Sequence, residues 1–286
     1  MALETAYEEC AALVRAHDRD RYLASLFAPA EVRPNLQALY AFDIETARIP
    51  AIVSEPMIGE IRLQWWRDAL GGVAHGDLSA APVLAALQDT LYRFGLGPDQ
   101  LIALTEARIF DLYDDRMPDI DTLEGYAGET AGTILQMAAT MLAGSAVAGA
   151  ADVSGHGGVA SVICRGLSAL VASGLRDGRL VPTALGDDHG AVIDASRSEP
   201  AENCDAVWAA LCKTALSHAQ QAQRALKSCD DVIDAAYLHL CLTFRDLKRL
   251  QTRGPVVGTA SPGSALARQW HLWRAVRSGG LRGTKL

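Results

Sequence analysis

Three aspartates in the C-terminal third of the chain have a spacing that could bind a divalent cation. Asp230, Asp231 and Asp234 occur in the stretch SCDDVIDAAYLHL. On an α-helix, residues four positions apart share a face, so these carboxylates could converge on a hard cation such as Mg²⁺. Aspartate also favours the N-cap and first turn of a helix, where its carboxylate accepts backbone N–H bonds. Because this acidic triplet stands alone, a helix start is the favoured interpretation over a metal site.

A second acidic stretch and the histidines lack the spacing of known metal sites. The stretch DLYDDRMPDID, residues 111–121, lacks the spacing of a calcium-binding helix–loop–helix, so a solvated helix end is expected there. The seven histidines, His156 and His189 among them, are dispersed and include no HExxH pair, which makes a zinc hydrolase improbable. Nucleophile-elbow, P-loop and dinucleotide-binding motifs are also missing from the sequence.

Composition indicates a helical protein that does not bind nucleic acid. Half of the 286 residues are hydrophobic and only 6% are aromatic, with alanine and leucine prominent, which favours helix-on-helix packing. The formal net charge of −8 argues against a general nucleic-acid binder, which needs a basic face. Six cysteines without CxxC spacing indicate a reducing compartment rather than a zinc or disulfide framework.

The N-terminal stretch and the lengths of the apolar runs predict where the protein is located. The N-terminal stretch MALETAYEECAALVRAHD lacks a basic segment followed by an apolar one, and no run reaches about 18 uninterrupted apolar residues. We therefore expect a soluble cytoplasmic protein, with peripheral contact to a membrane as an additional expectation.

Apolar periodicity predicts helices along most of the chain. Proline and glycine mark the boundaries, with Ser54 expected to cap one helix and Pro50 to kink or stop another. The predicted fold class is all-α, with a single domain over residues 1–278, a disordered tail at 279–286 and a lid or surface loop at 174–198. The expected helices span residues 3–16, 32–49, 54–71, 80–94, 98–115, 119–145, 148–173, 200–228, 230–251 and 262–277.

Two tryptophan pairs call for different interpretations. In IRLQWWRDAL, Leu63, Trp66 and Leu70 share a face, and the two adjacent indoles point in different directions. Core packing is favoured for one of the two, and the other could line a pocket or a partner surface. The C-terminal helix carries Trp270 and Trp273. Packing of both rings into the fold is favoured there over contact with an anionic membrane. The basic residues around that second pair are Arg268, Arg274, Arg277, Arg282 and Lys285.

Several separated blocks resemble one known family. The stretch RYLASLFAPAEVRPNLQALYAFDIETARIPAIVSEP, the block GRLVP, and Tyr126 followed by AGETAG occur in order and at similar spacing in the squalene/phytoene synthase family. The resemblance runs from about residue 15 to Val276. It implies an all-α isoprenoid-synthase fold around a central cavity that holds prenyl chains. Catalytic members join two prenyl diphosphates head to head after Mg²⁺-assisted ionisation.

The sequence departs from that family where magnesium would bind. Loss of diphosphate develops negative charge that Mg²⁺ on carboxylates must neutralise. Counting from Tyr40 places the first aspartate motif on residues 47–51, which read ARIPA, and the second motif falls near Ala169 and Ser173. The acids are missing at both places. We therefore expect neither a catalytic residue nor a resident metal, with Mg²⁺ required only if the chain is a synthase.

Nearby residues remain candidates for a pocket or a ligand site. Asp43 or Glu45 with Glu55 could form a relocated metal site, although Asp43 and Glu45 point to roughly opposite sides of a helix. Arg176 and Arg179 either retain diphosphate affinity or belong to a surface loop. The candidate pocket or ligand residues are Tyr40, Asp43, Glu45, Glu55, Arg62, Trp66, Tyr126 and Arg179.

One branch of the family resembles the chain more closely than the synthases do. The phytoene-synthase-like respiratory complex I assembly factors also carry AF, a short acidic segment and SE in this block, and have lost the aspartate motifs. The resemblance implies a non-catalytic assembly or scaffold factor with a respiratory-complex subunit as partner, a prenyl or lipid ligand, or both. The location would be cytoplasmic in a bacterium or matrix-side in a mitochondrion, and the sequence favours the former. The alternatives are a Mg²⁺-dependent head-to-head prenyltransferase and a lipid carrier.

Overall fold

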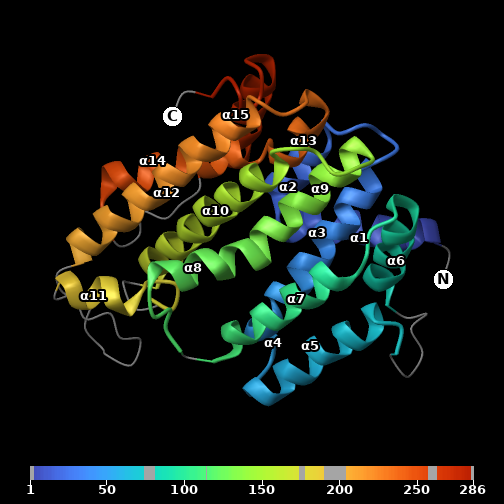
Figure 1. Cartoon of the computed structure of the whole chain (residues 1–286), viewed down its shortest axis with the longest axis horizontal. Helices are drawn as coiled ribbons and strands as arrows, with labels where there is room; N and C mark the ends of the chain where they lie inside the picture. Colours follow the sequence, from blue (N-terminus) through green and yellow to red (C-terminus); the bar gives the residue numbers. More distant parts are fainter. Residues whose placement is uncertain are drawn as a thin grey trace. The chain divides into compact units, whose positions relative to one another are not determined.

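Helices joined by short turns make up the computed structural model, which describes residues 3–73, 81–113, 115–173, 178–189, 204–256 and 263–284. No β-strand occurs in these described ranges, which confirms the all-α prediction. The α-helices are α1 (Leu3–His17), α2 (Arg19–Ser25), α3 (Arg33–Ala47), α4 (Ile49–Ile52), α5 (Pro56–Leu70), α6 (Pro82–Phe94), α7 (Asp99–Ala107), α8 (Ile120–Ala127), α9 (Thr133–Ala143), α10 (Ala150–Ala172), α11 (Thr183–His189), α12 (Cys204–Leu226), α13 (Asp234–Tyr237), α14 (Leu240–Arg253) and α15 (Ala265–Arg277). The 3₁₀ segments η2 (Arg108–Leu112) and η4 (Asp231–Ile233) and the π-helical segment η3 (Gly128–Gly132) complete the described elements (Figure 1).

The chain folds into two compact units, each made of three separate segments. The first unit contains Met1–Tyr113, Thr133–Ala148 and Asp230–Ala236. The second unit contains Asp114–Gly132, Gly149–Cys229 and Tyr237–Leu286. The chain therefore passes from one unit to the other several times. The single domain expected over residues 1–278 stays a prediction.

Helix α3 forms the centre of the first unit. Apolar residues at helical spacing predicted this helix, and Pro34 lies in its first turn, where its missing N–H costs no hydrogen bond. The helix packs against α1, α6 and α9. It is buried on almost every side, and its buried residues include the polar side chains Asn35, Gln37 and Asp43. A helix buried all round must satisfy such polar groups within the fold.

Helix α10 has the corresponding place in the second unit, where it lies beside α12 (Figure 1). Glycine allows close packing on its other side, because a Cβ atom on Gly158 would lie only 2.7 Å from the backbone nitrogen of Gly132 in the π-helical segment. Among the described residues, α10 is also the one helix long and apolar enough to cross a membrane, but 61% of that window is buried inside the fold.

Several predicted helix boundaries were wrong. Ser54 does not cap α5, because the N-cap residue is Glu55, whose side chain makes no capping hydrogen bond. The helix expected over 119–145 is interrupted by the π-helical segment at Gly128–Gly132. The polar stretch after α1 forms α2, which we did not predict and which Asp18 caps by accepting from the backbone N–H of Arg21 at 2.9 Å.

The aspartates of SCDDVIDAAYLHL begin a 3₁₀ turn rather than the long helix that we expected over 230–251. Asp230 caps η4 by accepting from the backbone N–H of Val232 at 3.0 Å. The long helix α14 begins only at Leu240. The helix-start interpretation therefore fits Asp230, but the structure it starts is a short one.

Two segments near the ends of the second unit also differ from expectation. Residues 279–284, expected in a disordered tail, form turns in which Leu281 is 1% exposed and its carbonyl accepts from Gln223 Nε2 at 2.8 Å. Within the loop expected at 174–198, residues 183–189 form α11. Residues 178–182 of that loop are also described, whereas residues 174–177 and 190–198 lie outside the described residues, as do Arg176 and Lys285.

Candidate functional site

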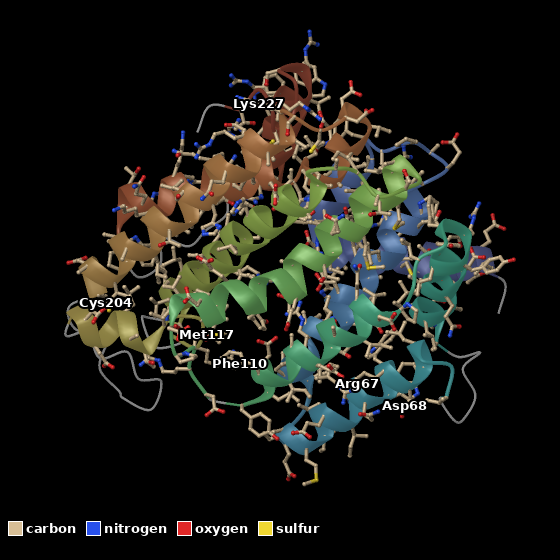
Figure 2. The ribbon with its side chains drawn as sticks, viewed as in Figure 1. Arg67, Asp68, Phe110, Met117, Cys204 and Lys227 are labelled. Atoms are coloured by element: carbon tan, nitrogen blue, oxygen red, sulfur yellow. The ribbon has the colours of Figure 1, made fainter. Side chains whose placement is uncertain are left out.

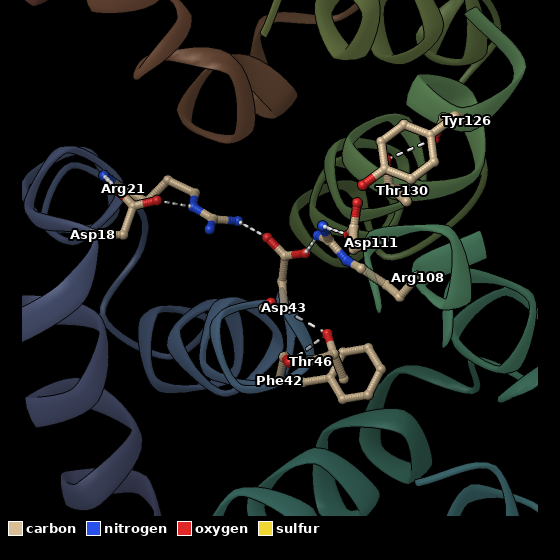
Figure 3. Close-up of polar contacts among 9 residues, drawn as sticks. All are labelled: Asp18, Arg21, Phe42, Asp43, Thr46, Arg108, Asp111, Tyr126 and Thr130. Carbon is tan, nitrogen blue, oxygen red and sulfur yellow. Dashed lines mark hydrogen bonds and ion pairs between the residues drawn. The ribbon is translucent and has the colours of Figure 1, made fainter. Parts of the chain in front are cut away.

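Asp43, on α3, is held between two arginines that come from distant parts of the first unit. Its Oδ2 atom accepts a hydrogen bond from Arg21 Nη1 at 2.7 Å, and its Oδ1 atom accepts one from Arg108 Nη2 at 2.7 Å. Asp43 and Arg108 are each only 4% exposed. Figure 3 shows the carboxylate with one guanidinium on either side. Both carboxylate oxygens are therefore engaged in buried, charge-assisted hydrogen bonds.

Two further acids extend this arrangement outward. Arg21 also donates from Nε to Asp18 Oδ2 at 2.5 Å, and Arg108 donates from Nη1 to Asp111 Oδ2 at 3.2 Å (Figure 3). Acids and arginines thus alternate in one cluster, which we call the Asp43 cluster: Asp18, Arg21, Asp43, Arg108 and Asp111. Each buried arginine lies between two carboxylates, so its charge is compensated where water is excluded.

The electrostatics of the Asp43 cluster keep Arg21 charged. Burial by itself lowers the pKa of Arg21, but the charges of Asp18 and Asp43 and their hydrogen bonds outweigh it, so the pKa lies above its ordinary value. The guanidinium of Arg21 also lies over the ring of Tyr40, 5.1 Å from the ring centroid. Burial raises the pKa of Tyr40 to about 12, although the charge of Arg21 opposes this rise. Tyr40 is therefore a neutral, buried wall of the cluster.

The residues around Asp43 do not fit a magnesium ion. Mg²⁺ needs carboxylate oxygens that can face it, and both oxygens of Asp43 already accept from guanidinium groups. Glu45 is partly buried, and burial raises its pKa, which disfavours the charged form that a cation requires. Among the described residues, no group of three or more His, Cys, Asp or Glu side chains is arranged to hold a metal ion.

The other candidates in the first unit occupy different surroundings. Trp66, a candidate pocket residue, is buried and packs edge-on against Phe42, with ring centroids 5.0 Å apart. The neighbouring Trp65 is half-buried and contacts Trp66 in the same edge-on manner. Glu55 and Arg62 are exposed on α5. The structure thus gathers Tyr40 and Asp43 in one cluster and leaves Glu55 and Arg62 at the surface.

Tyr126 and Arg179 belong to the second unit. Tyr126 is buried near the end of α8, and its carbonyl accepts from the hydroxyl of Thr130 in the π-helical segment at 2.6 Å. The backbone carbonyl of Arg179 accepts from the N–H of Met117 at 3.0 Å, which ties the GRLVP block to the segment before α8. Met117, labelled in Figure 2, is itself fully buried.

A histidine pair was missed by the sequence analysis. The Nδ1 atoms of His156, on α10, and His218, on α12, lie 3.0 Å apart, and His218 Nε2 lies 3.1 Å from Glu124 Oε1. Because the carboxylate can only accept, neutral His218 must carry its proton on Nε2 and accept from His156 through Nδ1. Burial lowers the pKa of His156, and the neighbouring His218 lowers it further. No local spacing announces this pair, since 62 residues separate its members.

Comparison with known proteins agrees with the helical architecture. The family model for squalene/phytoene synthase matches residues 14–274. A crystal structure of a dehydrosqualene synthase has a TM-score of 0.77 and 16% identity and covers 96% of both chains. A squalene synthase, HpnC, from Alicyclobacillus acidocaldarius has a TM-score of 0.71 and 20% identity over 89% of this chain and 96% of that one. At these identities the likeness shows the shared fold.

Curated proteins with higher sequence identity belong to a different functional group. The NADH dehydrogenase (ubiquinone) complex I assembly factor 6 of Bos taurus is 33% identical over 133 residues, and that of Homo sapiens is 32% identical over 133 residues. Each match covers 46% of this chain and 40% of the relative's length. The family match spans most of the chain, from residue 14 to residue 274, and the resemblance seen in the sequence is thereby confirmed. The chain belongs to the squalene/phytoene synthase family.

Proposed function

We propose that this chain is a non-catalytic assembly or scaffold factor for respiratory complex I. The observation that carries the proposal is the state of Asp43, an acid on α3 close to the positions where the family's first magnesium motif is expected. Both of its oxygens accept from arginines, the partly buried Arg21 and the buried Arg108. A carboxylate engaged in this way forms ion pairs within the first unit rather than binding a metal diphosphate.

The similarity to assembly factors supports the same proposal. Those relatives are 32–33% identical to the matched part of the chain, whereas the solved synthases are 16–20% identical. The region that matches covers 40% of each assembly factor, so the partner is proposed from similarity over a part of those proteins. The proposed partner is a subunit of the respiratory complex.

The proposed location follows from the proposed partner. An assembly factor acts where the subunits of its complex meet, so we place the chain on the cytoplasmic side of a bacterial membrane, or on the matrix side in a mitochondrion. We also propose that the family's central cavity retains a prenyl or lipid-like ligand, with neither Mg²⁺ nor another cofactor. Extraction of the purified protein with organic solvent, followed by mass spectrometry, tests for such a ligand.

The competing function is a Mg²⁺-dependent prenyltransferase. Turnover would require carboxylates that bind Mg²⁺, and the residues that occupy the expected positions of the first motif are Ala47, Arg48, Ile49, Pro50 and Ala51. None of these can replace an aspartate as a metal ligand, since none carries a carboxylate. The Asp43 cluster offers no replacement for them.

Incubation with prenyl diphosphates separates the two functions. The purified chain is mixed with farnesyl or geranylgeranyl diphosphate, Mg²⁺ or Mn²⁺ and NADPH, beside an active synthase, and released pyrophosphate and extracted hydrocarbons are measured. We expect no metal-dependent release from a folded sample. Turnover that disappears in a folded Asp230→Asn, Asp231→Asn double variant would instead establish a metal site at those aspartates and refute the proposal.

The partner is tested in the native host. The tagged full chain is isolated from mildly solubilised membranes, and co-purifying proteins are quantified against an untagged strain. We expect subunits of respiratory complex I to be enriched. Absence of these subunits, together with prenyl-diphosphate turnover, would identify the chain as a synthase.

A further inference from the structure

A basic pocket lies between α14 and α15 in the second unit. Its volume is about 680 Å³. Arg245 and Lys248 of α14 line one side, and His271, Arg274 and Arg277 of α15 line the other. Among the described residues that line this pocket there is no aspartate or glutamate. The pocket is therefore suited to an anion.

The walls of the pocket are fixed by contacts within the second unit. Arg268 Nη1 donates to Asp246 Oδ2 at 2.6 Å, which fastens α15 to α14. Ser264 caps α15 by accepting from the N–H of Ala267 at 3.2 Å. The turn after α15 is held in place where Arg282 Nη1 donates to the carbonyl of Cys229 at 3.1 Å. The basic side chains thus project from a framework that is already built.

Basic side chains gather around the pocket although the whole chain is acidic. Burial lowers the pKa of His271, and the nearby charges of Arg245, Arg274 and Arg249 lower it further. Burial likewise lowers the pKa of Arg245. The charge of Asp246, whose Oδ1 lies 3.4 Å from Arg245 Nη2, opposes this effect, and the charges of Arg268 and Arg249 add to it. Against a formal net charge of −8 for the chain, these basic groups form a local concentration of one sign.

An apolar stripe runs along α15 beside the pocket. Leu266, Trp270 and Trp273 are 79%, 57% and 42% exposed and recur at the spacing of one helix face. The two indoles stack with ring centroids 5.1 Å apart. The guanidinium of Arg277 lies over Trp273, 4.7 Å from its ring centroid. The prediction that both tryptophans pack into the fold is therefore wrong, because the inner face of α15 is occupied by smaller residues such as Leu272.

We propose that the α14–α15 pocket and the apolar stripe of α15 form a docking surface for a membrane containing anionic phospholipids. The pocket takes the phosphate of a lipid headgroup, and the stripe enters the interface between headgroups and acyl chains. Basic residues beside exposed Trp and Leu on one helix match a surface that is anionic outside and apolar inside. A free phosphate would account for the basic pocket but would leave the exposed indoles without a function. This surface is independent of the complex I proposal.

Vesicle flotation tests the docking surface with the full chain. Vesicles of phosphatidylcholine alone are compared with vesicles containing phosphatidylglycerol, at low and high salt. We expect binding to the anionic vesicles only, weakened by salt. Removing two cations by Arg274→Ser with Arg277→Ser should weaken binding about tenfold or more. The matched control, Arg15→Ser with Arg93→Ser, removes two exposed charges from the first unit and should leave binding unchanged.

A second variant separates the apolar stripe from the charges. Trp270→Ser should weaken vesicle binding at unchanged salt dependence, because it removes interfacial contact without changing charge. Three outcomes would overturn the proposal. These are equal binding to neutral vesicles, equal loss in the Arg15 and Arg93 control, and binding of inorganic pyrophosphate or an acidic peptide in the pocket without vesicle binding. Circular dichroism of each variant ensures that only folded protein is compared.

Discussion

The central helices of the two units differ in the side chains that they bury. Helix α3 buries Asp43 and compensates it with Arg21 and Arg108, so charges of both signs are enclosed in the first unit. Helix α10 buries mainly small and apolar residues, and Gly158 brings its backbone against the π-helical segment. The basic groups of the second unit instead line a pocket at α14 and α15.

This difference separates charges that form ion pairs within the fold from charges that can bind a ligand. A buried carboxylate between two arginines has its charge compensated, and their positive charges disfavour a cation beside it. Removing one member leaves the others uncompensated. Basic residues that gather around a pocket with no aspartate or glutamate among its described lining residues can contribute to binding an anion. From family membership alone, the acids on α3 would be the candidates for ligand binding. The structure instead indicates the cations on α14 and α15.

The largest expected effect comes from breaking the Asp43 cluster. Asp43→Asn replaces one carboxylate oxygen with an amide group that would face a guanidinium donor. We expect the free energy of unfolding to fall by about 3 to 5 kcal/mol. Denaturant unfolding of the variant beside the exposed-acid control Glu31→Gln measures this effect. The control should change by less than about 0.5 kcal/mol, and an equally small change for Asp43→Asn would show that its ion pairs do not stabilise the unit.

A smaller effect is expected from changing the backbone packing of the second unit. Gly158→Ala would place a Cβ atom 2.7 Å from the nitrogen of Gly132 and 3.0 Å from the carbonyl oxygen of Ala127. Because these are backbone atoms, relief requires a helix to shift, and we expect a loss of about 1 to 3 kcal/mol.

Gly155, one turn earlier on α10, provides a matched control for this packing. A Cβ atom there has nothing within 4 Å, so Gly155→Ala should be neutral or stabilise the fold by up to about 1 kcal/mol. Thermal unfolding of both variants measures the contrast. Equal stability of the two variants would contradict close packing between α10 and the π-helical segment.

Alkaline pH provides a milder test of the first unit's interior. The pKa of Tyr40 is raised from 10.0 to about 12 by burial, so its contribution to stability is complete below pH 10 and is lost as pH rises through about 12. Tyr40→Phe keeps the ring under Arg21 but removes this titration. The stability of the variant, measured by urea unfolding below pH 10 and near pH 12, should fall less than that of the original chain. Identical pH dependence would mean that Tyr40 is hydrated.

The smallest expected effect concerns the α14–α15 pocket. Arg274→Ser and Arg277→Ser remove exposed charges that lie near other cations, so each should change the free energy of unfolding by less than about 0.5 kcal/mol. Differential scanning calorimetry at low and high salt measures this change. A loss comparable to that of Asp43→Asn would show that these arginines hold the fold, and the contrast between the two regions would fail.

Local patterns in the sequence predicted the elements but not their long-range partners. Periodicity with Pro82 and Gly95 at its ends located α6, and the same signals located most of α15. Asp43 was one of the candidates, yet nothing local indicated its partners Arg21 and Arg108, which lie 22 and 65 residues away. Such pairs depend on how helices pack.

Two other features of the structure could not be predicted from sequence patterns, for related reasons. The π-helical segment at Gly128–Gly132 adds a residue to a turn without breaking the apolar periodicity that predicted one helix there. The late start of α14 at Leu240 was hidden because the acids from Asp230 onward also suit a helix start. Local propensity cannot separate such cases, since tertiary contacts decide between them.

The amount of assembled respiratory complex I in a deletion strain tests the central claim most directly. Membranes from the native host lacking this chain are compared with membranes from the strain complemented by the full chain, using native gels and NADH oxidation. We predict that assembled complex I falls on deletion and returns on complementation, without any change in prenyl-derived hydrocarbons. A normal amount of complex I, together with loss of a hydrocarbon product, would contradict the account and identify the chain as a synthase.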